Sequence, residues 1–190
     1  MSADRDGSQL KTERLDLVIG GSELAAQMLA YHTRNRAHLE PWGPPMPESL
    51  FTMDWWERSA ERVHEEWQAG RAYRWTVLEG GGVVGTVALF GIRRLHWQSC
   101  ELGFGLDAAR QGRGLMTEAV GAALAYAFDD LALHRVSATH RVDNLASRRV
   151  LDRLGFVEEG IIREHAIAHG EWRDQVSMGL LATEFGGGLS

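Results

Sequence analysis

Lysine is almost absent from this chain of 190 residues, in which Lys11 is the only one. The formal net charge is −6 at pH 7. A surface that binds nucleic acid by neutralising phosphates normally carries an excess of lysine and arginine. The charge balance therefore argues against direct binding to nucleic acid, and it suits a cationic partner such as an amine or a basic peptide.

Long hydrophobic runs and cysteine are equally scarce. No window approaches the ~18 uninterrupted apolar residues that a membrane-spanning helix needs, and the polar N-terminus lacks the apolar core of a secretory signal. Cys100 is the single cysteine, which excludes an internal disulfide framework. We therefore expect a cytoplasmic protein with no membrane partner.

Metal ligands and a cysteine nucleophile are not expected either. The eight histidines form no tight cluster with the spacing of a metal site. Cys100 is predicted to lie on the apolar face of a strand, where a thiol usually acts as a small core residue. We expect no metal, and we interpret Cys100 as part of the core.

Proline is confined to one segment. All four prolines lie within HLEPWGPPMPES, residues 38–49, so this segment must be an irregular loop. The composition, with 44% hydrophobic residues, suits one compact domain. We predict a single domain over residues 11–185, a disordered segment at 1–10 and a flexible tail at 186–190.

The pattern of apolar residues predicts an α+β domain. The predicted order is one strand, two helices, three strands, a helix, a strand, a helix and two strands, which suggests a mixed sheet. In WQSCELGFGLD, Cys100 and Leu102 alternate with Glu101 and Gly103. Glu101 is therefore expected on the face opposite the apolar residues.

Glycine and arginine gather in RQGRGLMTEAV, residues 110–120, directly before a predicted helix. Amides at a helix N-terminus have no intrahelical partner, and glycine lets the oxygens of an anion approach them. Arg110 and Arg113 can add charge-assisted contacts. The loop suits a phosphate or pyrophosphate, although a plain turn from strand to helix would use glycine as well.

This loop, together with HRVSATHRVDNLASRRVLDRLGF, resembles the GNAT superfamily of N-acetyltransferases. Gln111 and Gly114 match the (Gln/Arg)-x-x-Gly-x-(Gly/Ala) signature, and Met116 departs from its last position. Asn144 and Ser147 begin a second matching pattern that ends in Leu-Gly-Phe at 154–156. The resemblance implies the GNAT fold, a mixed and mostly antiparallel sheet flanked by helices with two splayed central strands, and it implies that the loop binds acetyl-CoA.

Three further segments narrow the resemblance to the RimJ/RimL-type branch, which acetylates protein N-termini. They are TERLDLV at 12–18, NRAHLEPW at 35–42 and GEWRDQVSM at 170–178. The resemblance spans about residues 11–182. It implies an acetyltransferase acting on a protein N-terminal α-amine, such as that of a ribosomal protein. A homodimer is a separate expectation.

The resemblance also implies roles for two groups of side chains. Glu101 is the candidate for accepting the proton of the amine, and Ser147 lies where this branch places a serine near the cofactor sulfur. For cofactor binding we expect Phe104, Leu106, Arg110, Gln111, Gly112, Arg113, Gly114, Leu115, Met116, Thr117, Asn144, Ser147 and Arg148. For the acceptor we expect Asn35, Arg36, Trp42, Glu101 and Asp174.

Simpler structural roles remain open for the same residues. Glu101 can be an ordinary half-exposed strand carboxylate, and Gly103 and Gly105 can mark a β-bulge. Asn144 can be only the N-cap of a short helix. The proline-rich segment can be only a rigid connector.

The function itself has two alternatives. The enzyme can acetylate a small amine, such as an antibiotic, a polyamine or an amino sugar, because a fold alone does not fix the acceptor. The domain can also be a non-catalytic sensor of acyl-CoA.

Overall fold

The computed structural model describes residues 7–168 and 170–186. Its centre is an eight-stranded sheet with the order β1-β2-β3-β4-β5-β6-β8-β7. In chain order the strands are β1 (Gln9–Lys11), β2 (Asp16–Ile19), β3 (Tyr73–Glu79), β4 (Gly82–Arg93), β5 (Ser99–Leu106), β6 (Arg135–Arg141), β7 (Val157–Ala168) and β8 (Glu171–Leu181). The α-helices are α1 (Ala25–Leu39), α2 (Met53–Gln68), α3 (Leu115–Ala125) and α4 (Leu145–Arg153).

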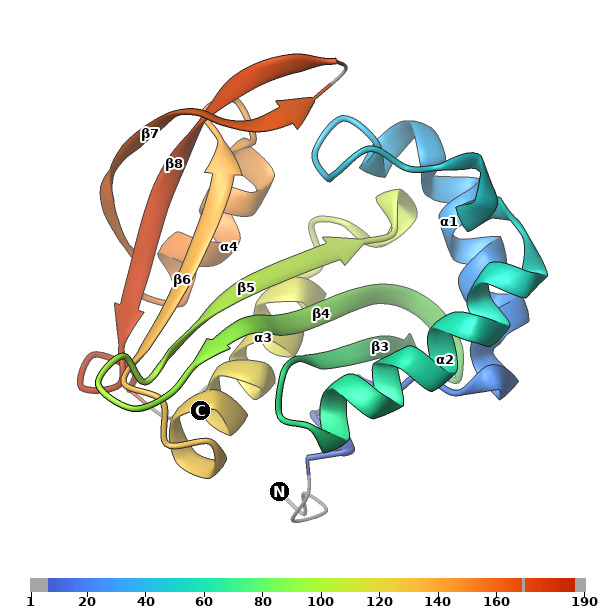
Figure 1. The fold of residues 1–190 in the computed structure, drawn as a ribbon, viewed down its shortest axis with the longest axis horizontal. Coiled ribbons are helices and arrows are strands. Elements are labelled where there is room, and N and C mark those ends of the chain that lie inside the picture. The colour runs from blue at the N-terminus through green and yellow to red at the C-terminus, as the bar shows by residue number, and fades with distance from the viewer. Residues whose placement is uncertain (1–6, 169, 187–190) are drawn as a thin grey trace.

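The two central strands diverge, as the resemblance predicted. β5 and β6 form the parallel pair of the sheet, and they are paired only from Ser99 to Glu101, opposite Arg135 to Ser137. The other neighbours are antiparallel. Beyond Glu101, β5 turns toward α1 while β6 continues beside the β7–β8 hairpin (Figure 1). The splay leaves one edge of β5 unpaired next to the helix N-terminus of α3.

Helices cover both faces of the sheet. α1 and α2 lie on one face, and α3 and α4 lie on the other (Figure 1). The main core lies between α3 and the sheet, and its fully buried aliphatic side chains include Leu89 of β4 and Leu115 and Leu124 of α3. Burial of each such side chain contributes about 1.5–3 kcal/mol relative to exposure. A smaller cluster under α1 contains Leu24, Met28, Tyr31 and Val83.

The alternation predicted for the strand before the loop is confirmed. Cys100 and Leu102 of β5 are buried in the main core, and Glu101 is exposed on the opposite face. The four predicted helices and their order along the chain are also confirmed. Within the described residues, no helix is long and apolar enough to cross a membrane.

The N-terminal boundary of the domain differs from the prediction. Residues 9–11 form β1, which pairs with β2, and Leu10 is buried in the main core. The indole of Trp75 donates a hydrogen bond to the carbonyl of Gly7 at 2.9 Å. A short strand of three residues shows too little alternation to be detected, so the sequence placed the boundary too late. Residues 1–6 and 187–190, which hold most of the predicted disordered segment and tail, lie outside the described residues.

Candidate active site

The loop between β5 and α3 is built around two left-handed glycines. The φ angles of Gly112 and Gly114 are 74° and 76°, in a region that costs other residues about 1–2 kcal/mol. Apart from its chain neighbours, no described atom lies within 4 Å of a Cβ built on Gly112. α3 begins at Leu115, directly after the loop. Its first amides therefore face open space at the positive end of the helix dipole, an arrangement that favours an anionic ligand.

Asp107 anchors the start of this loop. Its carboxylate accepts hydrogen bonds from the amide of Ala109 at 2.9 Å and from Nε of Arg34 at 2.7 Å. Arg34 also donates to the carbonyl of Val83 at 2.6 Å. Burial alone would raise the pKa of Asp107, but the hydrogen bonds from Arg34, Ala109 and Asn35 outweigh it and hold that pKa below its ordinary value. The end of β5 is thereby tied to α1.

Asn35 adds a second tie between α1 and the loop. Its side-chain oxygen accepts from the amide of Ala108, and its amide group donates to the carbonyl of Tyr31, both at 3.0 Å. The residue is 2% exposed. Arg34, Asn35 and Asp107, which we call the α1 latch, hold the loop in place before any ligand binds.

A cleft of about 550 Å³ opens beside the loop. It lies between the end of β5, the first turn of α3 and the N-terminal half of α4. Most of the predicted cofactor residues line it: Phe104, Leu106, Gln111, Gly112, Gly114, Leu115, Met116, Thr117, Asn144 and Ser147. The splay of β5 from β6 thus coincides with a cleft that ends at a helix N-terminus.

The glycines of β5 do not form a bulge. Gly103 and Gly105 pair in regular register with Ala88 and Thr86 of β4, and the register shift lies farther along, between Phe90 and Arg93. A Cβ on Gly103 would lie 3.2 Å from a ring carbon of Phe90. Without side chains, the two glycines leave the surface of β5 open beside the point where it separates from β6. The bulge alternative is wrong.

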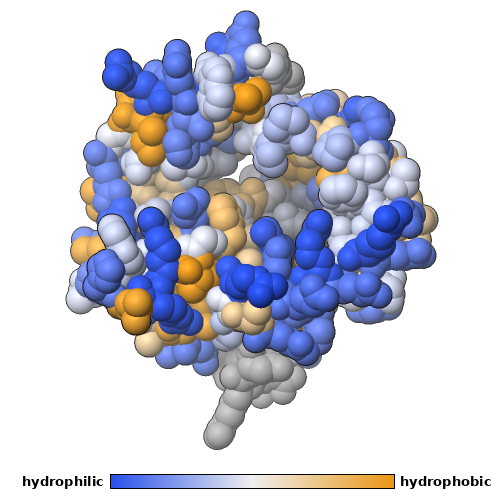
Figure 2. All heavy atoms as spheres, viewed as in Figure 1, coloured by the Kyte–Doolittle hydropathy of each residue, from blue (hydrophilic) through white to orange (hydrophobic). Residues whose placement is uncertain are grey.

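Glu101 lies at the point where the two central strands separate. It is the last residue of β5 that pairs with β6, and its partner there is Ser137. Its side chain is exposed and, within the described part of the chain, has no hydrogen bond or ion pair. Figure 2 shows a hollow between the β7–β8 hairpin and the segment joining α1 to α2. Glu101 does not line the cofactor cleft itself, because it lies on the α1–α2 face of the sheet.

A family model for the acetyltransferase (GNAT) domain matches residues 22–157. The chain belongs to the GNAT family. An Escherichia coli (strain K12) relative named ribosomal protein uS5-alanine N-acetyltransferase is 29% identical over 179 residues, which are 93% of this chain and 92% of the relative. This match extends well beyond the cofactor loop.

Solved structures agree with this assignment. The crystal structure of ribosomal-protein-S5-alanine acetyltransferase from Vibrio fischeri has a TM-score of 0.88 and 28% identity, covering 93% of this chain and 98% of that one. Mycobacterium smegmatis RimJ in complex with CoA-disulfide has a TM-score of 0.86 and 28% identity, covering 90% and 83%. The predicted GNAT fold is confirmed.

Within this GNAT domain, the side chain of Asn144 both caps α4 and lines the cleft. Its side-chain oxygen accepts a hydrogen bond from the amide of Ser147 at 3.1 Å, which is an N-cap of α4. It is also 9% exposed and lines the cofactor cleft beside Ser147. The N-cap is therefore present, and it fixes the start of α4 against the cleft, while a further role in ligand binding stays a prediction.

The arginines predicted to bind the phosphates lie outside the cleft. Arg110 and Arg113 form ion pairs with Glu79 at 3.2 and 2.7 Å. Arg148 pairs with Glu158 at 2.7 Å and with Asp152 at 3.5 Å. None of the three lines the cleft. In this structure their side chains turn toward carboxylates that tertiary contacts supply, and their contact with the phosphates stays a prediction.

Two other arginines line the cleft instead. Arg149 and Arg153 belong to α4, and neither forms an ion pair within the described residues. Residues four apart lie on the same side of a helix, so this spacing is the signal that could have identified them. Both guanidinium groups are available to an anionic ligand in the cleft.

The residues predicted to bind the acceptor do not form one group. Trp42 lines the cofactor cleft, with the Arg141 guanidinium 4.8 Å from its ring centroid. Arg36 pairs with Glu48 at 2.5 Å. Asp174 accepts a hydrogen bond from the amide of Glu164 at 2.8 Å within the β7–β8 hairpin.

Asn35 needs a correction. Its amide oxygen accepts from Ala108 and its amide nitrogen donates to Tyr31, and the side chain is buried, so it cannot line the acceptor cleft as expected. The sequence places Asn35 next to Arg36, but one helical residue corresponds to a rotation of about 100°. Neighbours on a helix therefore face different surroundings.

Cys100 is a core residue. It is fully buried, and burial together with the nearby Glu101 carboxylate raises the pKa of its thiol to about 12. A thiol that stays protonated is a poor nucleophile. The interpretation of Cys100 as part of the core agrees with its position.

Proposed function

We propose that this chain transfers the acetyl group of acetyl-CoA to the N-terminal α-amine of a protein, with a ribosomal protein as the expected acceptor. One observation carries the proposal: a cleft at the splay of β5 and β6 ends at the glycine-lined N-terminus of α3. The E. coli relative and the V. fischeri structure, both named as acetyltransferases of a ribosomal protein alanine, cover more than nine tenths of the chain.

The residues of the cleft suit acetyl-CoA as a co-substrate. The open backbone at Gly112 and the first amides of α3 would bind the pyrophosphate, and Arg149 and Arg153 would add positive charge. Phe104 and Leu106 would offer apolar surface and strand amides to the pantetheine arm. Acetyl-CoA supplies the activated acetyl thioester.

The acceptor amine must lose a proton to react. An α-amine has a pKa near ~8, so much of it is protonated at neutral pH. Glu101, at the end of the β5–β6 pairing, would take this proton directly or through water. The C–N bond then forms as the C–S bond breaks.

The leaving thiolate gains from a proton or a hydrogen bond. Ser147 lines the cleft on the first turn of α4, where its hydroxyl would donate to the departing sulfur. We propose no metal in this reaction, because a thioester is already activated and thiolate is a good leaving group. The homodimer stays a prediction, and the cytoplasm is the proposed location because nascent proteins and acetyl-CoA meet there.

The test is thiol release from acetyl-CoA with and without peptides that begin with Ala, Ser or Thr. We expect release that depends on the peptide, with mass spectrometry placing the acetyl group on the α-amine. Release that depends only on polyamines or amino sugars would overturn the protein-acceptor proposal. Tight binding of CoA without turnover on any amine would instead support the non-catalytic alternative.

A further inference from the structure

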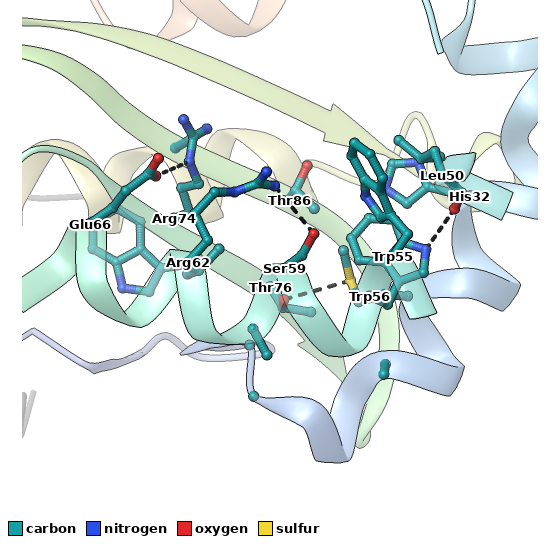
Figure 3. A pocket seen from close by; sticks show the side chains of 18 of the residues that line it. His32, Leu50, Trp55, Trp56, Ser59, Arg62, Glu66, Arg74, Thr76 and Thr86 are labelled. Atoms are coloured by element: carbon teal, nitrogen blue, oxygen red, sulfur yellow. Dashed lines mark hydrogen bonds and ion pairs between the residues drawn. The ribbon is translucent and has the colours of Figure 1, made fainter. Parts of the chain in front are cut away.

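A second cavity lies under α2, on the face of the sheet opposite α3. Its volume is about 490 Å³, and none of its lining residues lines the cofactor cleft. Thr76 of β3 and Thr86 and Ala88 of β4 form its floor, while Ala60 and Val63 of α2 belong to its wall. We call it the α2 cavity; Figure 3 shows many of its side chains.

The inner part of the α2 cavity is uncharged. His32 stacks on Trp56 with 4.7 Å between the ring centroids, and the indole of Trp56 donates to the carbonyl of Leu50 at 2.8 Å. Burial lowers the pKa of His32 to about 4, so its imidazole is neutral at physiological pH. With Met28 and Val63 nearby in the lining, this part favours an apolar group.

Two exposed arginines, Arg62 and Arg74, line the α2 cavity, and Figure 3 shows them near Ser59 and Glu66. Arg74 is already paired with Glu66 at 3.0 Å. Arg62 contacts the hydroxyl of Ser59 at 3.2 Å and lies 5.7 Å from the ring centroid of Trp55. Among the described residues, no carboxylate pairs with Arg62. Its charge is therefore free to attract an anionic group at the entrance.

The α2 cavity is close to the splay. Ala88 on its floor pairs with Gly103 of β5, and two residues farther along Phe90 pairs with Glu101. Neighbouring strands lie about 4.8 Å apart, and two residues along a strand span about 7 Å. The cavity floor is thus roughly 5–10 Å from Glu101, where the amine is proposed to lie. An extended peptide covers that distance in about two or three residues.

We propose that the α2 cavity binds an apolar side chain at the second or third residue of the acceptor polypeptide, with an acidic residue following it at Arg62. The shape and the uncharged interior suit the apolar side chain, and the unpaired guanidinium suits the carboxylate. This inference rests on the proposed function and specifies the class of its substrate: N-termini with an apolar residue followed by an acidic one.

The first test varies the peptide. Peptides that begin with alanine carry leucine or glycine at the second or third position, and kcat/KM is measured with acetyl-CoA in excess. We expect leucine to raise kcat/KM by about 10- to 100-fold at one of these positions. Ala60→Phe fills the cavity and should abolish this difference, while the exposed Ala30→Phe on α1 should keep it.

The second test reverses the charge. With aspartate or lysine placed after the leucine, the wild-type enzyme should prefer aspartate several-fold, and Arg62→Glu should prefer lysine. Arg58→Glu is the matched control, because Arg58 lies on the same helix but pairs with Asp54 and does not line the α2 cavity. An unchanged preference in Arg62→Glu would overturn the role of Arg62.

Each outcome separates the two proposals. Equal kcat/KM for leucine and glycine peptides would overturn the inference and leave N-terminal acetylation intact, whereas no transfer to any peptide would overturn both. Each variant is first checked for its melting temperature and its binding of acetyl-CoA. If Ala60→Phe does not fold, Ala88→Leu fills the same cavity from the sheet side and carries the same expectation.

Discussion

The two faces of the sheet are packed differently near the cofactor cleft and the proposed acceptor side. On the α3 face, aliphatic side chains of the helix and the strands form the fully buried main core, and the α1 latch fixes the adjoining loop. On the α2 face, a cavity of about 490 Å³ separates much of the helix from the strands. Only Ser59 and Trp67 of α2 are buried.

This contrast relates rigidity to the kind of ligand. A loop that must present several backbone amides to one anion binds more tightly if it is already ordered, because binding then costs less conformational entropy. A face that receives a polypeptide needs room for a side chain. The comparison predicts that changes on the α3 face alter cofactor affinity, whereas changes around Glu101 alter turnover.

The largest expected effect is on the reaction itself. Glu101→Gln keeps the shape of the side chain but cannot accept the proton of the amine, so kcat should fall by about 100-fold or more at neutral pH. The loss should shrink as pH rises above the pKa of the amine, because more of the acceptor is then neutral. The measurement is a pH–rate profile of both enzymes, with the dissociation constant for acetyl-CoA measured in parallel. A deficit that is the same at every pH would remove Glu101 from the proton transfer.

The next effect is on the cofactor loop. Gly112→Val forces a β-branched residue into a left-handed conformation and fills the open space beside the amides, so the dissociation constant for CoA should rise by about tenfold or more. Gly80→Val is the control, because Gly80 also has a positive φ, of 57°, and open surroundings but lies in the β3–β4 turn. Calorimetry should show weak binding by the first variant and normal binding by the second. Equal binding by both would contradict the pyrophosphate site.

A smaller effect distinguishes the two sets of arginines. Arg153→Ala should weaken CoA binding by about three- to tenfold at low salt, because it removes a charge-assisted contact of about 1 kcal/mol that salt screens. Arg113→Ala should change affinity less, since that side chain is paired with Glu79. Titrations at several salt concentrations measure both. A larger loss of CoA affinity in Arg113→Ala than in Arg153→Ala would show that the loop arginines contact the phosphates.

The smallest effect concerns the α1 latch at low pH. Because the folded-state pKa of Asp107 is lowered, its contribution to stability is present above the unfolded pKa of about 3.9 and is lost as pH falls through the lower folded value. Asp107→Asn should therefore lower the melting temperature near neutral pH by a few degrees and narrow its gap to the wild type in acid. Asp54→Asn, in the exposed pair with Arg58, is the control. A gap that stays constant down to pH 2 would exclude this ionisation as its cause.

Much of the site could be predicted because it depends on local chemistry. Glycines before a helix need no distant partner to adopt a positive φ or to expose amides, so Gly112 and Gly114 could be recognised in the sequence. Strand alternation likewise placed Glu101 and Cys100 on opposite faces. These features follow from backbone geometry within a few residues.

Other parts depended on contacts that the sequence does not display. Arg113 and Arg149 have the same side chain and lie in adjacent motifs. Arg113 pairs with Glu79 at the end of β3, whereas Arg149 faces the cleft. Asn35 was expected at the acceptor and instead holds Ala108 in place. The α2 cavity had no signal at all, since a gap between a helix and a sheet depends on how well their side chains fit.

By itself, the sequence determined the class of fold, the order of the main elements and the glycine loop before α3, because periodicity and glycine conformation act over short stretches of chain. The tertiary structure decided which arginines are free, which polar side chains are buried, and where the sheet is hollow. Those outcomes depend on pairing and packing between residues that are far apart in the chain. Two residues of the same type, such as Arg113 and Arg149, can therefore be paired with a carboxylate in one place and face the cleft in another.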